Sequence, residues 1–269
     1  MPLKTHAVRL FASAAVAVLA LGAGGCSNIG VVDTTGSIGA GSGAPVADAE
    51  LRRSLDTLGA RYRDNPANPD AAIAYARVLR ATDQRAQAVA VLEQASIRTP
   101  QNMALRGAYG RALADAGQFP QALEALDHAH TPDNPDWRIL NVQGAVLDQM
   151  GRHADAQLYY ASALKIVPNE ATVLSNLGLS YLLTKDLKNA EDTLRRAVAQ
   201  PNASPKVRQN LALVVGLRGR FAEAEKIAGA DLPESEAAAN IAYLRQMLAQ
   251  QGNLKKMGRA YTPAPDAGS

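Results

Sequence analysis

Small residues recur in this chain every 34 positions, and this period constrains its fold more than any other feature. Gly110, Gly144 and Gly178 are each 34 residues apart, as 144−110 and 178−144 show. Two alanines follow each glycine, 12 and 19 residues later, with a large apolar residue between them: Ala122, Leu126 and Ala129; Ala156, Tyr160 and Ala163; Ala190, Leu194 and Ala197. The same pattern continues one period earlier with Ala76, Ala88, Leu92 and Ala95, and one period later with Ala212 and Ala224. It ends at Asp231, where an alanine would be expected. Such a period indicates repeated structural units.

The offsets fit a pair of antiparallel helices. Two helices pack closely only where small side chains lie at their crossing, so Gly144 and Ala156 would each receive the bulk of the facing helix. A 34-residue period with small residues at these offsets resembles the tetratricopeptide repeat (TPR), a helix–turn–helix unit. The resemblance implies an all-α, right-handed TPR solenoid, because neighbouring pairs must stack to bury both faces of each pair. We expect about five repeats over residues 69–232, beginning near Pro69, Met103, Trp137, Ala171 and Pro205.

Turn residues support this frame. Gly117, Gly151 and Gly219 stand where first helices would end, and glycine favours the left-handed backbone of a helix C-cap. Pro100 and Pro168 stand where second helices would end. The composition agrees, because 47% hydrophobic residues with only 4% aromatic residues suit Ala/Leu helix packing better than a β-fold.

Amphipathic helices flank the repeats and are predicted to cap them. The first is predicted over 47–64, in a capping region 47–68, with one apolar face formed by Leu51, Leu55, Leu58 and Tyr62. The second is predicted from Pro233 to Gln250, in a capping region 233–258, with Ala237, Ile241, Leu244 and Leu248 inward and Glu234, Glu236, Arg245 and Gln246 outward. The ends of a solenoid need such covers. We expect the tail 259–269 to be disordered.

The first 25 residues are typical of a secretory signal peptide. A basic start with Lys4 and Arg9 precedes an apolar run from Leu10 to Leu21, which is too short to span a membrane. Small residues then lead directly to Cys26, the only cysteine of the chain, and resemble a bacterial lipobox in which that thiol receives a lipid. Lipoboxes usually carry leucine three residues before the cysteine, where this chain has Ala23. The alternative is an ordinary signal peptide with a stray cysteine.

Residues 26–46 are predicted to be a flexible, lipid-anchored tether. They are rich in Gly, Ser and Thr, and a chain of this composition behaves as a random coil. In the lipoprotein family an aspartate after the lipidated cysteine commonly retains the protein at the inner membrane, whereas Ser27 stands there in this chain. The resemblance therefore implies a lipid-anchored protein at the outer membrane that faces the periplasm.

The sequence contains no His-Glu-x-x-His and no Gly-x-Ser-x-Gly motif, so we expect a protein that is not an enzyme. His128 and His130, at the predicted end of a second helix, do not share a helical face, and no ligand set completes a zinc site around them. We expect His153 to be solvated in a turn and Glu223 and Glu225 to lie on solvated helix faces. No metal, cofactor or small-molecule substrate is expected. A net charge of +3, part of which leaves with the signal peptide, is far from the balance of a nucleic-acid-binding protein.

The resemblance to TPR proteins also implies a binding site. In that family the second, fifth, sixth and ninth positions of each repeat line a concave groove. The groove residues expected on this basis are Arg77, Arg111, Arg138, Asn141, Asn176, Lys206 and Asn210, with Asp70, Ile73, Gly107, Thr172, Ser175, Leu179, Gln209 and Leu213 at equivalent positions. Asparagine carries both a donor and an acceptor, so it can hold the backbone of an extended peptide. The alternative is that these are ordinary solvated polar residues.

The order of segments resembles one family of bacterial TPR lipoproteins. A lipobox, a Gly/Ser-rich tether, a capping helix, about five TPRs and a Pro/Ala tail are similar to the TadD family of the tight-adherence (Flp) pilus assembly system. The resemblance implies a scaffold or pilotin that assists assembly of the pilus secretion apparatus, with the pilus secretin or another assembly component as partner. The alternative is a periplasmic TPR adaptor lipoprotein for an envelope protease, a peptidoglycan hydrolase or an outer-membrane assembly machine.

Overall fold

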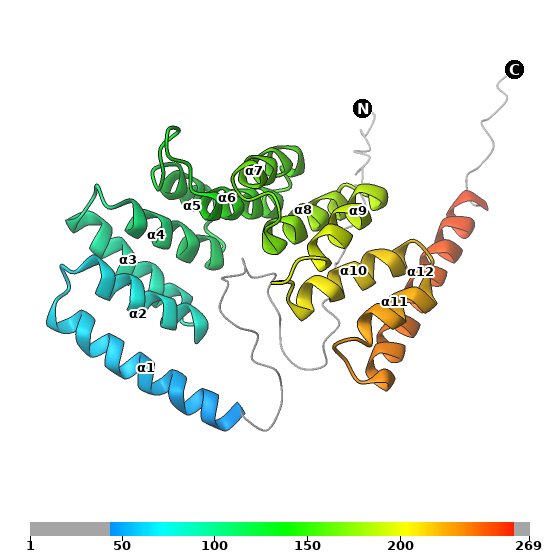
Figure 1. The fold of residues 1–269 in the computed structure, drawn as a ribbon, viewed down its shortest axis with the longest axis horizontal. Helices are drawn as coiled ribbons and strands as arrows, with labels where there is room; N and C mark the ends of the chain where they lie inside the picture. Colours follow the sequence, from blue (N-terminus) through cyan, green and yellow to red (C-terminus); the bar gives the residue numbers. More distant parts are fainter. Residues whose placement is uncertain (1–43, 261–269) are drawn as a thin grey trace, which may run out of the picture. The chain divides into compact units, whose positions relative to one another are not determined.

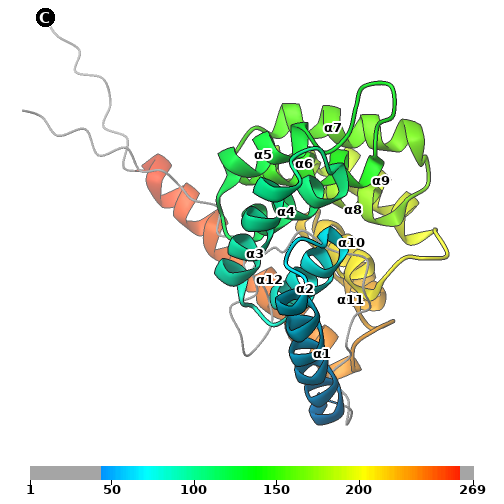
Figure 2. The same cartoon turned by 90° about the vertical axis from the view of Figure 1, so that its left-hand side faces the viewer.

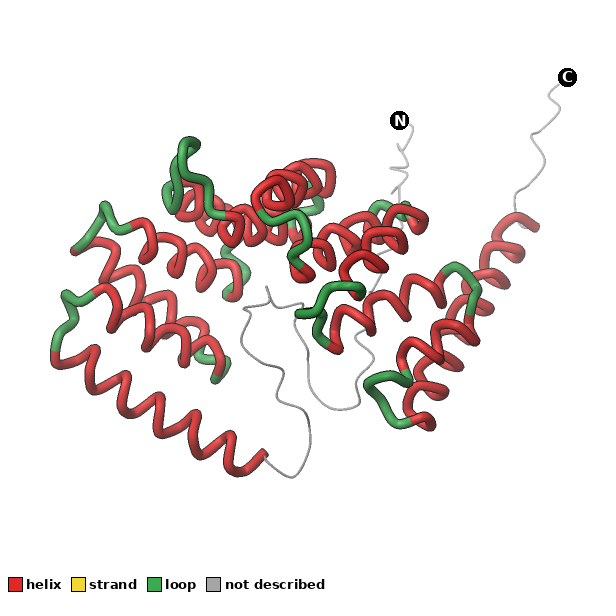
Figure 3. Tube along the Cα trace, viewed as in Figure 1, coloured by secondary structure: helices red, strands yellow, loops and turns green. Residues whose placement is uncertain are grey.

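A computed structural model describes residues 44–260, which form twelve α-helices and no strand (Figures 1 and 3). The predicted signal peptide, Cys26 and most of the tether lie outside the described residues, as does the tail after Ala260. Five helix pairs lie between two single helices, α1 (Ala44–Asp64) and α12 (Glu234–Ala260). The pairs are α2 (Pro69–Ala81) with α3 (Arg85–Arg98), α4 (Met103–Asp115) with α5 (Phe119–Asp127), α6 (Trp137–Gln149) with α7 (His153–Ile166), α8 (Ala171–Leu183) with α9 (Leu187–Val198), and α10 (Pro205–Leu217) with α11 (Phe221–Ala228).

The first helix of every pair begins at the residue that the 34-residue period predicts. In four of the five, the preceding residue is an N-cap whose side chain accepts a hydrogen bond from a backbone N–H of the first turn: Asn68, Asn102, Asp136 and Glu170. Such caps satisfy N–H groups that have no partner within the helix. The fifth first helix, α10, has a proline at its first position, which has no N–H to satisfy.

Two boundaries differ from the prediction, at the start of α1 and at the end of α12, which continues to Ala260, ten residues beyond Gln250. Helix α1 begins at Ala44, three residues before the predicted start, because Pro45 is tolerated in a first helical turn and does not end the helix. Helix α5 ends at Asp127 with His128 as its C-cap, so His128 lies at the end of the helix as predicted, and His130 lies in the loop that follows. Pro132 disfavours a helical conformation for the residue before it, and an isolated bridge joins Thr131 to Asn134 in this loop.

All five turns within the pairs contain one residue with a left-handed backbone. Gly117, Gly151 and Gly219 have φ of 75°, 76° and 84°, which confirms the predicted role of these glycines. Asp83 and Lys185 occupy the equivalent positions of the first and fourth pairs, with φ of 60° and 65°. The turn geometry is therefore common to all pairs, and two of them adopt it without glycine.

Small residues lie where the paired helices cross, as predicted. A Cβ atom on Gly110, Gly144 or Gly178 would lie 2.5, 2.6 and 2.6 Å from Leu126, Tyr160 and Leu194, respectively. Each contact partner is the large residue that follows 16 positions later in the repeat (126−110). The glycines thus bring the two helices of a pair together closely enough for these side chains to be completely buried.

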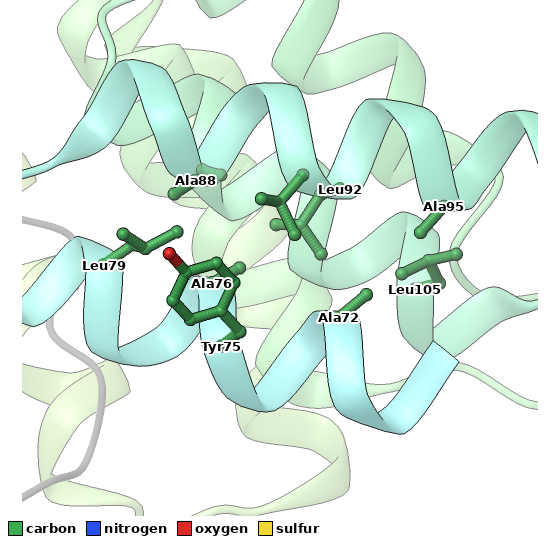
Figure 4. Close-up of a cluster of buried hydrophobic side chains, with 10 residues drawn as sticks. Ala72, Tyr75, Ala76, Leu79, Ala88, Leu92, Ala95 and Leu105 are labelled. Atoms are coloured by element: carbon green, nitrogen blue, oxygen red, sulfur yellow. The ribbon is translucent and has the colours of Figure 1, made fainter. Parts of the chain in front are cut away.

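Both single helices cover an end of the stack. Figure 4 shows the apolar cluster between α2, α3 and α4, on which Leu55, Leu58 and Tyr62 of α1 pack. The rings of Tyr62 and Tyr75 stack with their centroids 5.8 Å apart. At the other end Ile241 and Leu244 of α12 are buried against the last pair, where Leu244 occupies the space above Gly216. None of the described helices is both long and apolar enough to cross a membrane.

The first helices form one side of the stack. Each contacts the next, in the order α2, α4, α6, α8 and α10, and α12 continues this row. Among residues 44–260 no two second helices make such contacts, so the first helices approach one another more closely than the second helices do. Figure 2 is turned by 90°, so that α1, α2 and α3, which lie at the left of Figure 1, face the viewer. The side of the first helices that faces away from α3, α5, α7, α9 and α11 is called the first-helix face below.

Candidate protein-binding site

A ladder of polar side chains runs across α6, α8 and α10 on the first-helix face. Nδ2 of Asn176 donates a hydrogen bond to Oδ1 of Asn141 at 3.0 Å, and Nδ2 of Asn210 donates to Oγ of Ser175 at 3.0 Å. Each bond joins residues that are 35 positions apart, so it connects the fifth position of one repeat to the sixth position of the next. The period of the sequence therefore places equivalent side chains of successive helices within hydrogen-bonding distance.

Part of the ladder is committed to the fold and part is available to a ligand. Asn141 is only 4% exposed and Ser175 only 5%, so their main role is to hold the next asparagine in place. Asn176 and Asn210 are half-buried and use one amide hydrogen each in the ladder. Their Oδ1 atoms accept no hydrogen bond from other described residues, and a carboxamide oxygen can accept two. Two oriented acceptors on neighbouring helices suit the N–H groups of an extended peptide.

Lys206 adds a positive charge at the start of α10, next to the ladder. Its side chain is exposed, and it forms no ion pair with any other described residue. Desolvation by the surrounding protein nevertheless lowers the pKa of its ammonium group. Lys206 lies one helical turn before Asn210, so its ammonium group could meet an anionic group of a ligand that contacts the ladder.

The three arginines expected in the groove do not join this ladder. Arg77 is exposed on α2, and Arg111 on α4 is half-buried and is already engaged with a partner. Arg138 lies 4.5 Å above the ring of Trp137, and its nearest guanidinium nitrogen is 4.0 Å from the Asp136 carboxylate. Of the expected groove residues, the structure brings Asn141 into contact with Asn176, and Asn210 into contact with Ser175. Lys206 lies one helical turn before Asn210.

A second polar cluster was not foreseen, and it corrects the prediction for His153. This histidine is not a solvated turn residue, because its Nδ1 lies 2.8 Å from Oδ1 of Asp148, which also accepts a hydrogen bond from Ser180 at 2.8 Å. Tyr160 donates to the other oxygen of Asp148 at 3.0 Å. Burial raises the pKa of the Asp148 carboxyl, against these hydrogen bonds, which lower it. The cluster joins α6, α7 and α8.

A sequence signal for this cluster exists. Ser180 stands where the other four repeats have Val78, Ala112, Val146 and Val214, and Tyr160 stands where the others have Leu92, Leu126, Leu194 and Ala228. Ser180 and Tyr160 are thus polar residues at positions that are apolar in the other repeats, and together with Asp148 they indicate a buried hydrogen-bond network. The serine hydroxyl bonds to the carboxylate and not to the imidazole, so this is not the arrangement of a nucleophilic triad. Among residues 44–260 no group of three His, Cys, Asp or Glu side chains is placed to hold a metal ion.

The comparison with protein families and relatives agrees with the helix pairs. The family model described as tetratricopeptide repeat matches residues 73–135 and 142–205. An uncharacterized protein named y4yS from Sinorhizobium fredii (strain NBRC 101917 / NGR234) is 35% identical over 106 residues. The match covers 39% of this chain and 57% of that protein, so the chain spans little more than half of this relative.

Several solved structures share the fold. PilW, described as a widely conserved type IV pilus biogenesis factor, has a TM-score of 0.64 and 16% identity, and the match covers 73% of this chain and 93% of PilW. A TPR protein from Parabacteroides merdae ATCC 43184 has a TM-score of 0.58 and 17% identity, and the match covers 77% of this chain and 82% of that protein. The Cut9–Hcn1 structure of APC/C has a TM-score of 0.63 and 15% identity, but this chain covers only 41% of the matched chain.

The fold is therefore a TPR solenoid, the architecture of protein-interaction scaffolds. TPR domains bind protein partners. The resemblance to PilW at this identity is a resemblance of fold.

Proposed function

We propose that this chain is a lipid-anchored, non-enzymatic scaffold that assists assembly of a tight-adherence (Flp) pilus by holding an extended segment of a partner protein. The observation that carries the proposal is the polar ladder Asn141–Asn176 and Ser175–Asn210, in which asparagines on two neighbouring first helices each keep an Oδ1 atom that accepts no hydrogen bond from the described residues. The pilus assignment is supported by the resemblance of its segment order to the TadD family. The fold shared with a type IV pilus biogenesis factor is consistent with it.

The partner we propose is the pilus secretin or another assembly component. An extended chain laid across α6, α8 and α10 would present its backbone N–H groups to Oδ1 of Asn176 and Asn210, and a carboxylate of the same segment would meet Lys206. Backbone contacts hold a segment without selecting its side chains, whereas the lysine selects for an acidic group.

The binding prediction is tested with a combined Asn176→Ala, Lys206→Ala and Asn210→Ala variant. Each lost neutral hydrogen bond should weaken binding by about 0.5–1.5 kcal/mol, and the loss of the bond to the ammonium by about 1.5–3 kcal/mol. We expect the variant to remain helical but to lose co-purification of the secretin and surface pili in parallel. The measurements are secretin capture and counts of piliated cells.

A matched control replaces the same residue types away from the first-helix face, as Asn65→Ala, Lys165→Ala and Asn202→Ala, all of which are exposed. It should capture the secretin and make pili like the wild type. If the ladder variant folds, captures its partner and supports piliation as well as this control does, the first-helix face is not the binding site. If capture is lost but the captured protein belongs to a different envelope machine, the site stands and the pilus role fails.

We also propose that Cys26 carries a lipid that anchors the protein to the outer membrane on its periplasmic side. Cys26→Ala should then move the protein from the membrane fraction to the soluble periplasm, because one apolar anchor would be lost. Fractionation with mass spectrometry of the N-terminal peptide measures this. A Cys26→Ala protein that stays in the membrane fraction, with a wild-type peptide that carries no acyl group, would contradict the anchor.

A further inference from the structure

Three arginines converge on one buried carboxylate at the C-terminal end of the repeats. The side chain of Glu191 on α9 is only 4% exposed, and it forms ion pairs with Arg195 of the same helix and with Arg218 and Arg220 of the turn between α10 and α11. Nε of Arg195 donates to Oε1 of Glu191 at 2.9 Å, and Arg218 and Arg220 both contact Oε2. Helices α9, α10 and α11 are consecutive neighbours in the stack (Figure 1).

Glu223 at the start of α11 completes the group; its side chain is 38% exposed, on a solvated face as predicted, and it also forms ion pairs. It accepts from Nη2 of Arg195 at 2.5 Å and lies 3.2 Å from Nη1 of Arg220. Burial would raise the pKa of the Glu191 carboxyl, but hydrogen bonds from Arg220, Arg195 and Arg218 outweigh it and lower this pKa to about 2. The group sets three guanidinium charges against two carboxylate charges, which leaves one positive charge in excess.

The excess charge is directed to solvent. The side chains of Arg195, Arg218 and Arg220 are 43%, 36% and 41% exposed, although each touches the buried carboxylate. A guanidinium carries five N–H donors, and Arg218 uses one of them on Glu191. Arg245 of α12 lies 4.8 Å above the ring of Phe221, the residue that follows Arg220 in the sequence, and forms no ion pair with another described residue. Arg195, Arg218, Arg220 and Arg245 are called the arginine cluster.

We infer that the arginine cluster is a docking surface for an acidic segment of a partner protein. Guanidinium groups bind carboxylates through paired hydrogen bonds, and Glu191 already shows three of these side chains in that role. The carboxylates of an acidic segment would use the remaining donors of Arg218 and Arg245 and balance the excess charge. The cluster lies on α9, on the turn between α10 and α11 and on α12, whereas the ladder lies on α6, α8 and the N-terminal half of α10. The inference therefore stands independently of the pilus role.

The test measures binding of a fluorescent poly-glutamate peptide to the purified full-length protein, with a poly-glutamine peptide of the same length as the neutral probe. The Arg218→Gln, Arg245→Gln variant removes two charges and leaves Arg195 and Arg220 on Glu191. We expect it to bind poly-glutamate about tenfold more weakly than the wild type, the loss that corresponds to one charge-assisted hydrogen bond. The control Arg85→Gln, Arg152→Gln removes two charges from ion pairs with Asp83 and Asp155. It should bind like the wild type.

Three results would overturn the inference. The first is no binding of poly-glutamate by the wild type, or equal binding of poly-glutamine. The second is the same loss in both double variants, which would show that net charge alone attracts the peptide. The third is binding to phosphatidylglycerol vesicles, dependent on Arg218 and Arg245, without binding to the peptide, since the cluster would then bind a membrane surface. Thermal unfolding of both double variants verifies that they are folded.

Discussion

Gly144→Leu is expected to lower the free energy of unfolding by about 3 kcal/mol, the upper part of the range for overpacked cores. A Cβ atom at this position would lie 2.6 Å from Cε1 and 2.9 Å from Cδ1 of Tyr160. That ring is 1% exposed, and its hydroxyl donates to Asp148. The ring cannot move away from a new side chain without breaking this hydrogen bond, so two stabilising contacts are lost together.

Gly178→Leu is expected to have the same sign and a smaller effect. Its added Cβ would meet Cγ of Leu194 at 2.6 Å, but a leucine side chain can adjust and forms no hydrogen bond that this would break. Urea unfolding followed by circular dichroism measures both variants. Ala161→Leu, on the exposed side of α7, adds the same bulk without a facing helix and should change stability by less than about 0.5 kcal/mol. If Gly144→Leu is no less stable than Ala161→Leu, the helices do not cross at Gly144.

A double replacement tests whether direct contact between residues 144 and 160 at the helix crossing determines the loss of stability. Ala76 and Leu92 occupy in the first repeat the positions of Gly144 and Tyr160, so that pair shows a tolerated combination of side chains. Gly144→Ala with Tyr160→Leu copies it into the third repeat. We expect this double variant to lose less stability than the sum of its two single variants, because contacting residues are coupled. Strict additivity would contradict a direct contact between the two positions.

The fold could be predicted from sequence because its determinants repeat. Each first helix begins at a residue fixed by the 34-residue period, and each crossing glycine faces a large residue at a constant offset. Turn geometry was predicted at Gly117 but not at Asp83 and Lys185, since only glycine gives a signal for a left-handed backbone.

The polar contacts were harder to predict than the packing. The period places Asn176 and Asn210 on the same face, but their bonds to Asn141 and Ser175 depend on how far each pair is rotated against the next. The ion pairs of Glu191 join α9 to the turn after α10, residues 27 positions apart for Arg218, an offset that no repeat position specifies. Such contacts depend on side-chain geometry across repeats, and a sequence pattern fixes only the helix faces.

Asp148→Ala is the second replacement with a large expected effect, a loss of about 3–5 kcal/mol in the free energy of unfolding. It removes the acceptor for Tyr160, Ser180 and His153 at once, and the hydroxyl groups of Tyr160 and Ser180, which are 1% and 0% exposed, would be left buried without a partner. Urea unfolding measures the loss. Asp155→Ala breaks an exposed pair with Arg152 and should lose at most about 1 kcal/mol. Equal losses in the two variants would show that the cluster around Asp148 does not stabilise the fold.

The pH dependence of the same carboxyl separates its burial from its hydrogen bonds. Burial raises the pKa of Asp148 above the ordinary value of 3.8, even though hydrogen bonds from His153, Ser180 and Tyr160 oppose this. The stability that this group contributes is therefore complete below that value and is lost as pH rises through the raised pKa. Asp148→Asn does not titrate, so the stability of the parent minus that of Asp148→Asn should fall as pH rises from about 4 towards neutrality. Both proteins should carry His153→Gln, so that the neighbouring imidazole does not titrate over the same interval. A difference that rises with pH instead would mean that hydrogen bonding, and not burial, controls the ionisation of Asp148.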